Sequence, residues 1–289
     1  MRFKGLAGPV TGRLDKRVIG GAVGAVAVVV LALVLAPRSG AAQASLTVNL
    51  PPAASDRVYG APEARGRPIV IIDAGHGGRD PGATSVSGEV HEKDLTLALA
   101  QDLRDLLVKR GRVRVAMTRE DDRYLTLDER AAVARRLDAA MFISLHMDSA
   151  PNPLARGATV YSLSDVASDA EAARLAAAEN ERTDGDEGNG SVDGILSDLA
   201  MRSQMGASAE LAAKLVNKSA GRFELRPNPH RFAAFHVLRR AGAPAVLFES
   251  GYLSNVDDEA LLRSPDQRSK IALALAQAIE AEVASRAVR

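Results

Sequence analysis

The sequence predicts a single α/β domain with a largely parallel central sheet, helices on both faces of that sheet, and a helical insertion. Short apolar runs have the pattern of strands buried on both faces; they lie at 69–72, 141–145 and 245–248. Amphipathic helical patterns lie between or after these runs, at 93–110, 126–139 and 266–286. Strands that alternate with helices favour parallel pairing, because each crossover returns the chain to the same edge of the sheet.

The chain begins with the features of an export signal. Five basic residues precede residue 18, and Val18–Ala36 then carries no charge over 19 residues. Ala42–Ala44 offers a small-residue cleavage site. The uncharged stretch also approaches the roughly 20 residues that span a bilayer. We therefore expect residues 1–44 to be either a signal peptide, which we favour, or an N-terminal membrane anchor. Both interpretations place the rest of the chain outside the cytoplasm, with residues 45–66 as a linker to a domain at 67–289.

Composition narrows the class of partner. Residues 1–44 contain six of the 37 Lys and Arg residues and one of the 36 Asp and Glu residues, so the rest of the chain has a net charge of −4. That charge argues against nucleic acid as a partner. The chain has no cysteine, so packing rather than disulfides must hold the exported domain together. No large apolar stripe stands out, and we expect a monomer that meets the membrane only through its N-terminal segment.

The first predicted strand, 69–72, stops in a glycine-rich turn that contains His76. Ligands of open α/β sheets bind at the carboxyl edge of the strands. A histidine held among glycines can approach a metal or a substrate closely. The alternative is a histidine that only caps the turn.

The next elements follow from local signals. The helix at 93–110 places its leucines on one face and is ended by Gly111. A strand at 113–117 comes next. Thr126 and Glu129 have the spacing of a capping box, which predicts a helix that continues to about residue 139.

Two later strands also end in a side chain that can bind a metal or a proton. His146 follows the strand at 141–145, and Glu249 follows the strand at 245–248; a further strand is predicted at 157–163. Because parallel strands end at one edge, we expect His76, His146 and Glu249 to converge there. Glu92 begins the first helix within reach of the same edge.

This set of side chains has the chemistry of a catalytic zinc site. Two histidines and a carboxylate commonly hold zinc with the fourth position left to water, and a further carboxylate can act as the general base. Structural roles are also open to these residues. Glu92 could only complement the helix dipole, His91 could be the ligand in its place, and His146 could be a core histidine. A structural role is harder to find for Glu249, because a buried carboxylate without a partner is costly.

Five motifs in order resemble those of the zinc-dependent N-acetylmuramoyl-L-alanine amidases of the amidase_3 family. They are Asp73–Ala83, Glu92–Asp94, Thr118–Arg119, Ser144–Asp148 and Glu249–Asn255. The resemblance covers about residues 67–286. It implies one zinc ion held by His76, Glu92 and His146, with Glu249 as the catalytic carboxylate. It also implies that the substrate is peptidoglycan, cut between N-acetylmuramic acid and L-alanine during wall remodelling and daughter-cell separation. Asp73, Asp80 and Asp148 are candidates to orient the ligand rings, and Arg119 is expected to pair with an acid near the surface.

Residues 164–205 interrupt the strand–helix alternation. We expect a helix at 169–182, a mobile loop at 183–191 and a second helix at 192–205. Septal amidases of Gram-negative bacteria, which the sequence resembles, carry a helical insertion here that blocks the zinc site through a glutamate until a LytM-domain activator displaces it. Glu179 and Glu181 lie on the corresponding segment, and Glu179 is the preferred autoinhibitory ligand.

Two other functions are compatible with the same residues. The metal site could belong to a zinc peptidase that cuts within the stem peptide. The chain could instead be a non-catalytic wall-binding regulator with a degenerate amidase fold, although all four site positions hold the residue types that catalysis needs.

Overall fold

The computed structural model describes residues 56–181 and 194–287. The expected export signal at 1–44 and the expected loop at 183–191 lie outside the described residues. Within the described ranges, none of the helices combines the length and the apolar character that crossing a bilayer requires.

The described part of the chain forms one seven-stranded sheet with the strand order β1-β3-β2-β4-β7-β5-β6. The strands are β1 (Val58–Tyr59), β2 (Ile69–Ala74), β3 (Arg114–Met117), β4 (Met141–Asp148), β5 (Ala158–Leu163), β6 (Leu225–Ala233) and β7 (Ala245–Tyr252). The β2/β3, β2/β4, β4/β7 and β5/β6 pairs are parallel, and the β1/β3 and β5/β7 pairs are antiparallel. The predicted largely parallel sheet is therefore confirmed.

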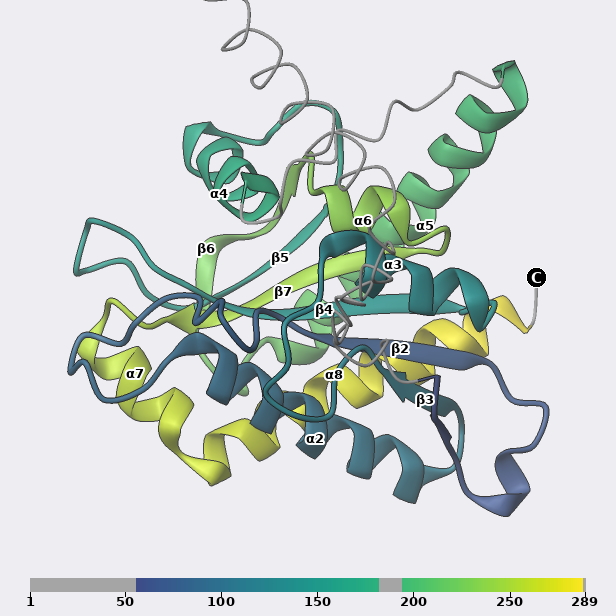
Figure 1. Ribbon diagram of the computed structural model, residues 1–289, viewed down its shortest axis with the longest axis horizontal. Helices are drawn as coiled ribbons and strands as arrows, with labels where there is room; N and C mark the ends of the chain where they lie inside the picture. The colour runs from purple at the N-terminus through teal and green to yellow at the C-terminus, as the bar shows by residue number, and fades with distance from the viewer. Residues whose placement is uncertain (1–55, 182–193, 288–289) are drawn as a thin grey trace, which may run out of the picture. The chain divides into compact units, whose positions relative to one another are not determined.

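Helices cover both faces of this sheet (Figure 1). They are α2 (Glu92–Arg110), α3 (Leu127–Arg136), α4 (Ala170–Glu181), α5 (Gly194–Ser219), α6 (His236–Arg240), α7 (Val256–Arg263) and α8 (Pro265–Arg286), with a short 3-10 helix at Pro62–Ala64. One apolar core contains Leu99 of α2, Leu211 of α5 and Leu275 of α8. The other contains Val133 of α3, Ala172 of α4 and Leu238 of α6. The predicted covering of both faces by helices is thus confirmed.

The sequence signals that start α3 and end α2 form the caps that were predicted. The side chain of Thr126 accepts a hydrogen bond from the Glu129 amide, and the Glu129 carboxylate accepts one from the Thr126 amide, which completes the capping box of α3. Gly111 ends α2 in the left-handed conformation with φ of 66°. The α3 helix ends at Arg136, three residues before the predicted end at 139.

The insertion is arranged differently from the prediction. The helix expected to stop at 205 continues as α5 to Ser219. Its second half belongs to the core, because Leu211, Ala212 and Leu215 are fully buried in the cluster that contains α2 and α8. A buried apolar face of this kind stabilises a helix more than its intrinsic propensity does. The second helix of the predicted insertion is therefore the first half of a longer helix that belongs to the domain core.

Two strands at the edges of the sheet are not predicted from the sequence. Residues 58–59 belong to the segment expected to be a linker, but they form β1 and pair with Val115 and Ala116. The β6 strand contains Pro227 and Pro229, which break the periodic signal. Proline is tolerated in an edge strand, where its missing N–H faces away from the ladder.

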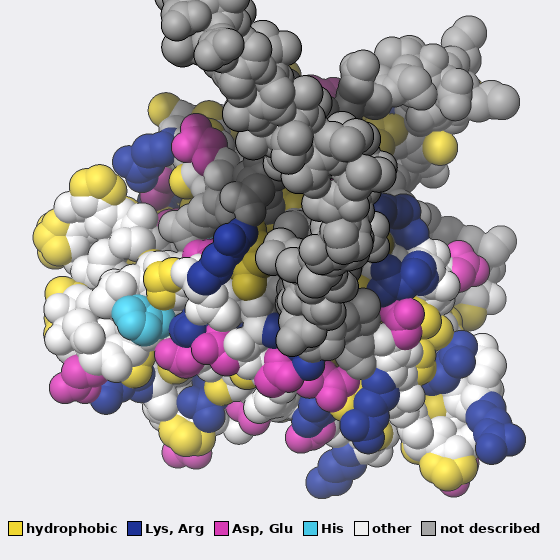
Figure 2. All heavy atoms as spheres, in the orientation of Figure 1, with side chains coloured by type: hydrophobic (Ala, Val, Ile, Leu, Met, Phe, Trp, Pro, Cys, Tyr) yellow, Lys and Arg dark blue, Asp and Glu magenta, His cyan; other side chains and the backbone are white. Residues whose placement is uncertain are grey.

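Figure 2 shows one face of the molecule, on which basic and acidic side chains are interspersed over the described surface. This mixture agrees with the near balance of 37 basic and 36 acidic residues in the whole chain.

Candidate metal centre

The sheet register brings the predicted site residues to one edge. The β2 and β4 strands run parallel, and the Gly75 amide that follows β2 donates to the Leu145 carbonyl at 3.0 Å. In the β4/β7 pair, His146 lies directly opposite Glu249. Both of these strands extend past their predicted ends, to Asp148 and Tyr252. His146 and Glu249 therefore lie within strands, where the ladder holds their backbones.

The turn that carries His76 is held by two buried arginines. His76 has a positive φ of 59°, which is unfavourable for a residue with a Cβ atom. Arg130 donates to the His76 carbonyl at 2.6 Å, and Arg119 donates to the Ala74 and Gly75 carbonyls at 2.9 and 2.8 Å. The prediction that Arg119 pairs with an acid near the surface is wrong. Its side chain is 1% exposed and donates hydrogen bonds to backbone carbonyls. Burial and the neighbouring Arg130 lower the Arg119 pKa to about 10.

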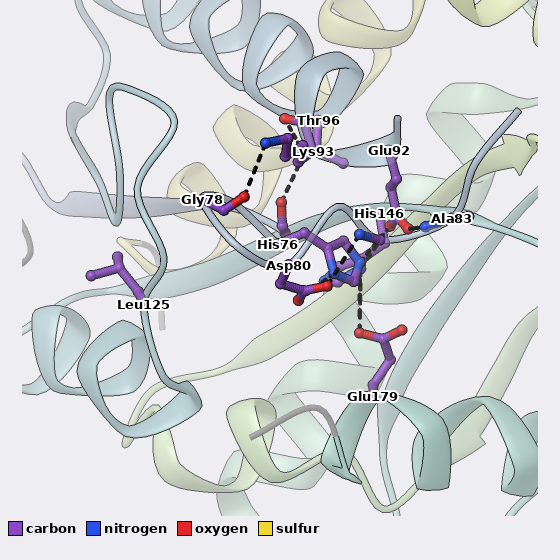
Figure 3. Close-up of polar contacts among 12 residues, drawn as sticks. His76, Gly78, Asp80, Ala83, Glu92, Lys93, Thr96, Leu125, His146 and Glu179 are labelled. Carbon is purple, nitrogen blue, oxygen red and sulfur yellow. Dashed lines mark hydrogen bonds and ion pairs between the residues drawn. The ribbon is translucent and has the colours of Figure 1, made fainter. Parts of the chain in front are cut away.

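Glu92 lies between the two histidines. Its Oε1 atom is 2.9 Å from His76 Nε2 and 3.0 Å from His146 Nδ1 (Figure 3). Oε2 accepts from the Ala83 amide at 2.8 Å, which fixes the carboxylate plane. His91 points elsewhere, and its Nδ1 atom is 3.2 Å from Thr84 Oγ1. Of the two neighbours that the sequence left as alternatives, the structure places Glu92 beside the histidines.

Glu179 approaches the same histidines from α4 on the other side (Figure 3). Its Oε2 atom is 3.8 Å from His76 Nε2 and 3.7 Å from His146 Nδ1. These three side chains form a cluster whose ligand atoms all lie within 4.8 Å of one another and which could hold a metal ion. Glu181, the other glutamate considered, is exposed.

The electrostatics of the cluster favour a bound cation. His76, His146 and Glu92 are 3%, 6% and 3% exposed. Burial alone would raise the Glu92 pKa, but the two imidazoles hold that pKa well below its usual value. Burial also opposes a charge on His76, yet Glu92 and Asp80 raise the His76 pKa to about 10. Two imidazoles that face the buried Glu92 carboxylate, with Asp80 and Glu179 close by, thus form a site where positive charge is strongly stabilised.

One of the three candidate orienting aspartates contacts a ring. Asp80 Oδ2 is 2.8 Å from His76 Nδ1, and Asp80 Oδ1 accepts from the Gly82 amide at 3.1 Å. Asp73 instead accepts from Arg130, Thr118 and Ser144, in a buried network that supports the His76 turn. Asp148 accepts from the Ser149 amide at 2.7 Å.

Two glycines are required by the closeness of the site residues. A Cβ atom on Gly75 would lie 2.5 Å from the His146 ring. A Cβ atom on Gly82, which has φ of 67°, would lie 2.5 Å from Glu92 Oε2 and 2.6 Å from His76 Cδ2. Each of these distances is shorter than any stable contact between the atoms concerned, so the glycine-rich turn allows the ligands to meet.

Glu249 belongs to the same site. It is 1% exposed. It lines a cavity of about 150 Å³ together with Glu92, Asp148 and Glu179. The cavity lies beneath α4, since Glu171 and Leu175 of that helix also line it. The second carboxylate predicted from the strand end is therefore at the same cavity as the histidine-bound carboxylate.

Arg130 and an arginine pair on β6 carry no local signal of their roles. Arg130 lies on the short amphipathic helix α3, where a charged residue normally faces solvent. Arg226 and Arg231 flank the prolines of an edge strand that the periodicity does not reveal. Only their long-range contacts distinguish these arginines from ordinary surface charges.

Comparison with known proteins gives one consistent result. Residues 70–281 match the family model Amidase_3, described as N-acetylmuramoyl-L-alanine amidase. The chain is 35% identical over 215 residues to the probable N-acetylmuramoyl-L-alanine amidase AmiB of Haemophilus influenzae, a match that covers 71% of this chain and 50% of that protein. It is 31% identical over 225 residues to the amidase AmiA of Escherichia coli, covering 76% of this chain and 77% of AmiA.

A solved structure extends the likeness to three dimensions. The catalytic domain of the amidase CwlV from Bacillus (Paenibacillus) polymyxa is 28% identical, with a TM-score of 0.53 over 73% of this chain and 96% of that domain. The region of this chain that matches the family model, 70–281, contains all of the site residues described above. The chain spans half the length of the Haemophilus relative that it matches.

Proposed function

Because this chain belongs to the N-acetylmuramoyl-L-alanine amidase family, we propose that it hydrolyses the amide bond between N-acetylmuramic acid and the L-alanine of the peptidoglycan stem peptide. The match over residues 70–281 confirms the family resemblance that the five motifs predicted. The observation that carries the proposal is the convergence of His76, Glu92 and His146 at one sheet edge, with Glu249 opposite His146.

The metal is proposed to be one zinc ion held by His76 Nε2, His146 Nδ1 and Glu92. Zinc bonds of about 2.0–2.1 Å separate tetrahedral ligands by roughly 3.3 Å. The carboxylate–imidazole distances of 2.9 and 3.0 Å are close to that spacing, and the donor set of two imidazoles and a carboxylate suits zinc. Asp80 would hold the His76 ring with Nε2 directed at the ion.

The proposed mechanism divides the reaction between the ion and the carboxylate. A bound zinc ion supplies Lewis acidity, which polarises a carbonyl group and lowers the pKa of water. Glu249 accepts the proton of the attacking water and returns it to the amide nitrogen as the alanine leaves. Glu249 is 1% exposed, so bulk water is largely excluded from its carboxylate. Arg119 and Arg130 keep the His76 turn in its strained conformation.

A wall-digestion experiment tests this function. The chain, loaded with zinc, is expected to release stem peptides with a free L-alanine amino terminus from purified peptidoglycan, and to leave the muramyl sugars intact. Mass spectrometry of the products identifies the cut. Fragments cleaved within the stem peptide would favour a peptidase in place of an amidase. A zinc-loaded protein that lacks the Glu179 contact of α4 could instead bind peptidoglycan and release no product. That result would favour a non-catalytic wall-binding protein.

Removal of the Asp80 carboxylate tests how the ion is held. Asp80→Asn is expected to weaken zinc binding by about 10- to 100-fold, the usual effect of losing a carboxylate that orients a ligand ring. Competition with a chromophoric chelator measures this affinity. The matched control is Asp122→Asn, because Asp122 accepts from the Gly78 amide of the same turn but does not contact a ligand ring. Equal zinc affinity in Asp80→Asn and the parent would contradict the proposed role.

We further propose that the enzyme acts in the periplasm. The basic residues, the uncharged stretch at 18–36 and the site at 42–44 support export, with cleavage after Ala44 or retention as an inner-membrane anchor. Peptidoglycan, the proposed substrate, lies in the same compartment. The linker assigned to 45–66 would then be shorter, since residues 58–59 pair with the sheet.

Autoinhibition by α4 is part of the proposal. Glu179 occupies the side of the histidine pair that a substrate carbonyl would need. Contacts at both ends support the position of the helix: Glu171 pairs with Arg226 and Arg231, while Asn180 accepts from the His236 amide at 2.8 Å and donates to the Ala234 carbonyl at 2.9 Å. An activator of the LytM-domain class would bind the protein with α4 displaced and shift the population to the open form.

A further inference from the structure

The Glu171 carboxylate of α4 is held by three donors of the sheet. Arg226 Nη1 lies 2.7 Å from Glu171 Oε1, and Arg231 Nη1 lies 2.9 Å from Oε2. The hydroxyl of Tyr252 donates to Oε1 at 3.0 Å. Burial alone would raise the Glu171 pKa, but these partners lower it to about 2. Both oxygens of one carboxylate are thus bound by fixed cationic and phenolic groups.

These donors belong to the sheet and not to the helix. Arg226 and Arg231 lie on β6, which pairs with β5, and Tyr252 ends β7. The Arg226 guanidinium also packs 5.1 Å from the centroid of the Tyr252 ring and donates to its hydroxyl. Tyr252 is fully buried and Arg231 is 7% exposed. If α4 moves away, the three donors remain together and would lose the carboxylate that they bind.

The three donors lie next to the catalytic cavity. Glu171 lines that cavity together with Glu92, Glu179 and Glu249. Arg226 and Glu171 together line an adjoining, more open cavity of about 480 Å³. Glu171 and Glu179 are eight residues apart on α4, which corresponds to about 12 Å along the helix axis. Because Glu179 contacts the histidines and Glu171 contacts the arginines, the path along α4 from the metal centre to the arginine pair is about this long.

The length of this path indicates which part of the substrate reaches the arginines. An extended peptide covers about 3.5 Å for each residue, so a path of about 12 Å corresponds to roughly three or four residues. The muramyl carboxyl group is consumed in the scissile amide, and the free carboxylates of the substrate are on the stem peptide. A carboxylate about three residues from the cut is at the distance of the arginines.

We propose that Arg226, Arg231 and Tyr252 form a subsite for a carboxylate on the third residue of the stem peptide, and that Glu171 fills this subsite while α4 covers the site. The ligand is the side-chain carboxylate of a diamino dicarboxylic acid at that position. This inference rests on the proposed amidase function. It means that α4 imitates the substrate at two points, with Glu179 at the metal centre and Glu171 at the carboxylate subsite.

The alternative is that the arginines only hold α4 in place. The two roles predict different substrate preferences, which can be measured. Two soluble muramyl tetrapeptides serve as probes, one with a free side-chain carboxylate on a third-position meso-diaminopimelate and one with that carboxylate amidated. The full chain carries Glu179→Ala and its zinc, so that the metal centre is accessible. We expect kcat/KM to be at least about tenfold higher for the free carboxylate, since a buried charge-assisted contact has about this effect.

Arg231→Gln in the same protein is expected to reduce this ratio to near one, mainly through KM for the free carboxylate. The matched control is Arg239→Gln, because Arg239 pairs with Asp165 at the surface. Glu171→Gln should keep the preference, since both arginines remain. If the arginines serve only α4, Arg231→Gln raises turnover of both substrates equally and leaves the ratio unchanged, which overturns the subsite.

Two results with the Glu179→Ala protein alone also test the proposal. They hold even if an arginine variant fails to fold. Equal kcat/KM for the two tetrapeptides in the Glu179→Ala protein would overturn the subsite and leave the amidase function intact. Turnover of neither tetrapeptide, with zinc bound, would contradict the proposed function and the subsite with it.

Discussion

Replacing Glu249 with glutamine is expected to lower kcat by about 10³-fold while zinc remains bound, because a general base typically contributes about 10² to 10⁴. Glutamine has nearly the same shape as glutamate but cannot accept the proton of the attacking water. Glu249 is 1% exposed and lies opposite His146 in the sheet register, so the replacement keeps the local packing. Release of stem peptides from peptidoglycan, measured at saturating substrate, checks the result.

Two measurements make this prediction specific to proton transfer. Zinc content by elemental analysis should equal that of the parent, because the proposed ligands are His76, Glu92 and His146. Glu224→Gln is the matched control, since Glu224 pairs with Arg156 at the surface, away from the ligands. A Glu249→Gln protein that retains a tenth or more of the parent kcat would rule out this carboxylate as the general base.

Replacing Glu179 with alanine is expected to raise the amidase activity of the full chain at least about tenfold without any activator. The carboxylate lies 3.8 and 3.7 Å from the two ligand nitrogens of His76 and His146. Removing one partner of a buried ion pair costs about 3–5 kcal/mol, and each step of about 1.4 kcal/mol changes a population ratio tenfold. Loss of this contact should therefore shift α4 toward the displaced state. Initial rates of wall digestion measure the change.

The neighbouring glutamate of the same helix provides the control. Glu181→Ala removes an exposed carboxylate two residues away and should leave the rate within about twofold of the parent. If Glu179→Ala is no more active than the parent, while zinc content and folding are unchanged, α4 does not inhibit the enzyme. An equal increase in both variants would point to general loosening of α4 and not to a contact with the metal centre.

Several parts of the fold could be predicted because their signals are local. The capping box of Thr126 and Glu129 and the left-handed Gly111 are each encoded within a few residues. Continuous apolar runs revealed the central strands β2, β4 and β7, which are buried on both faces. Edge strands such as β6 have no such run, and their existence depends on a neighbour that the local sequence does not contain.

The second half of α5 shows the same limit for helices. Its periodicity from 194 to 219 is diluted by small and polar residues. Leu211 and Leu215 are buried because α8, which begins only at Pro265, packs in the same core cluster. The end of the helix therefore depends on long-range packing.

The order of the amino acids is enough to specify the type of fold and the residue types that meet at the candidate centre. Strand ends that carry His76, His146 and Glu249, together with five ordered motifs, are local and follow a fixed order along the chain, so they can be recognised without coordinates. The directions of side chains and their long-range partners could be seen only in the folded chain. Glu92, and not His91, faces the histidines. Arg119 and Arg130 hold the His76 turn, and Glu171 pairs with two arginines of β6. These features depend on register, helix phase and burial, which arise only when segments far apart in the sequence pack together.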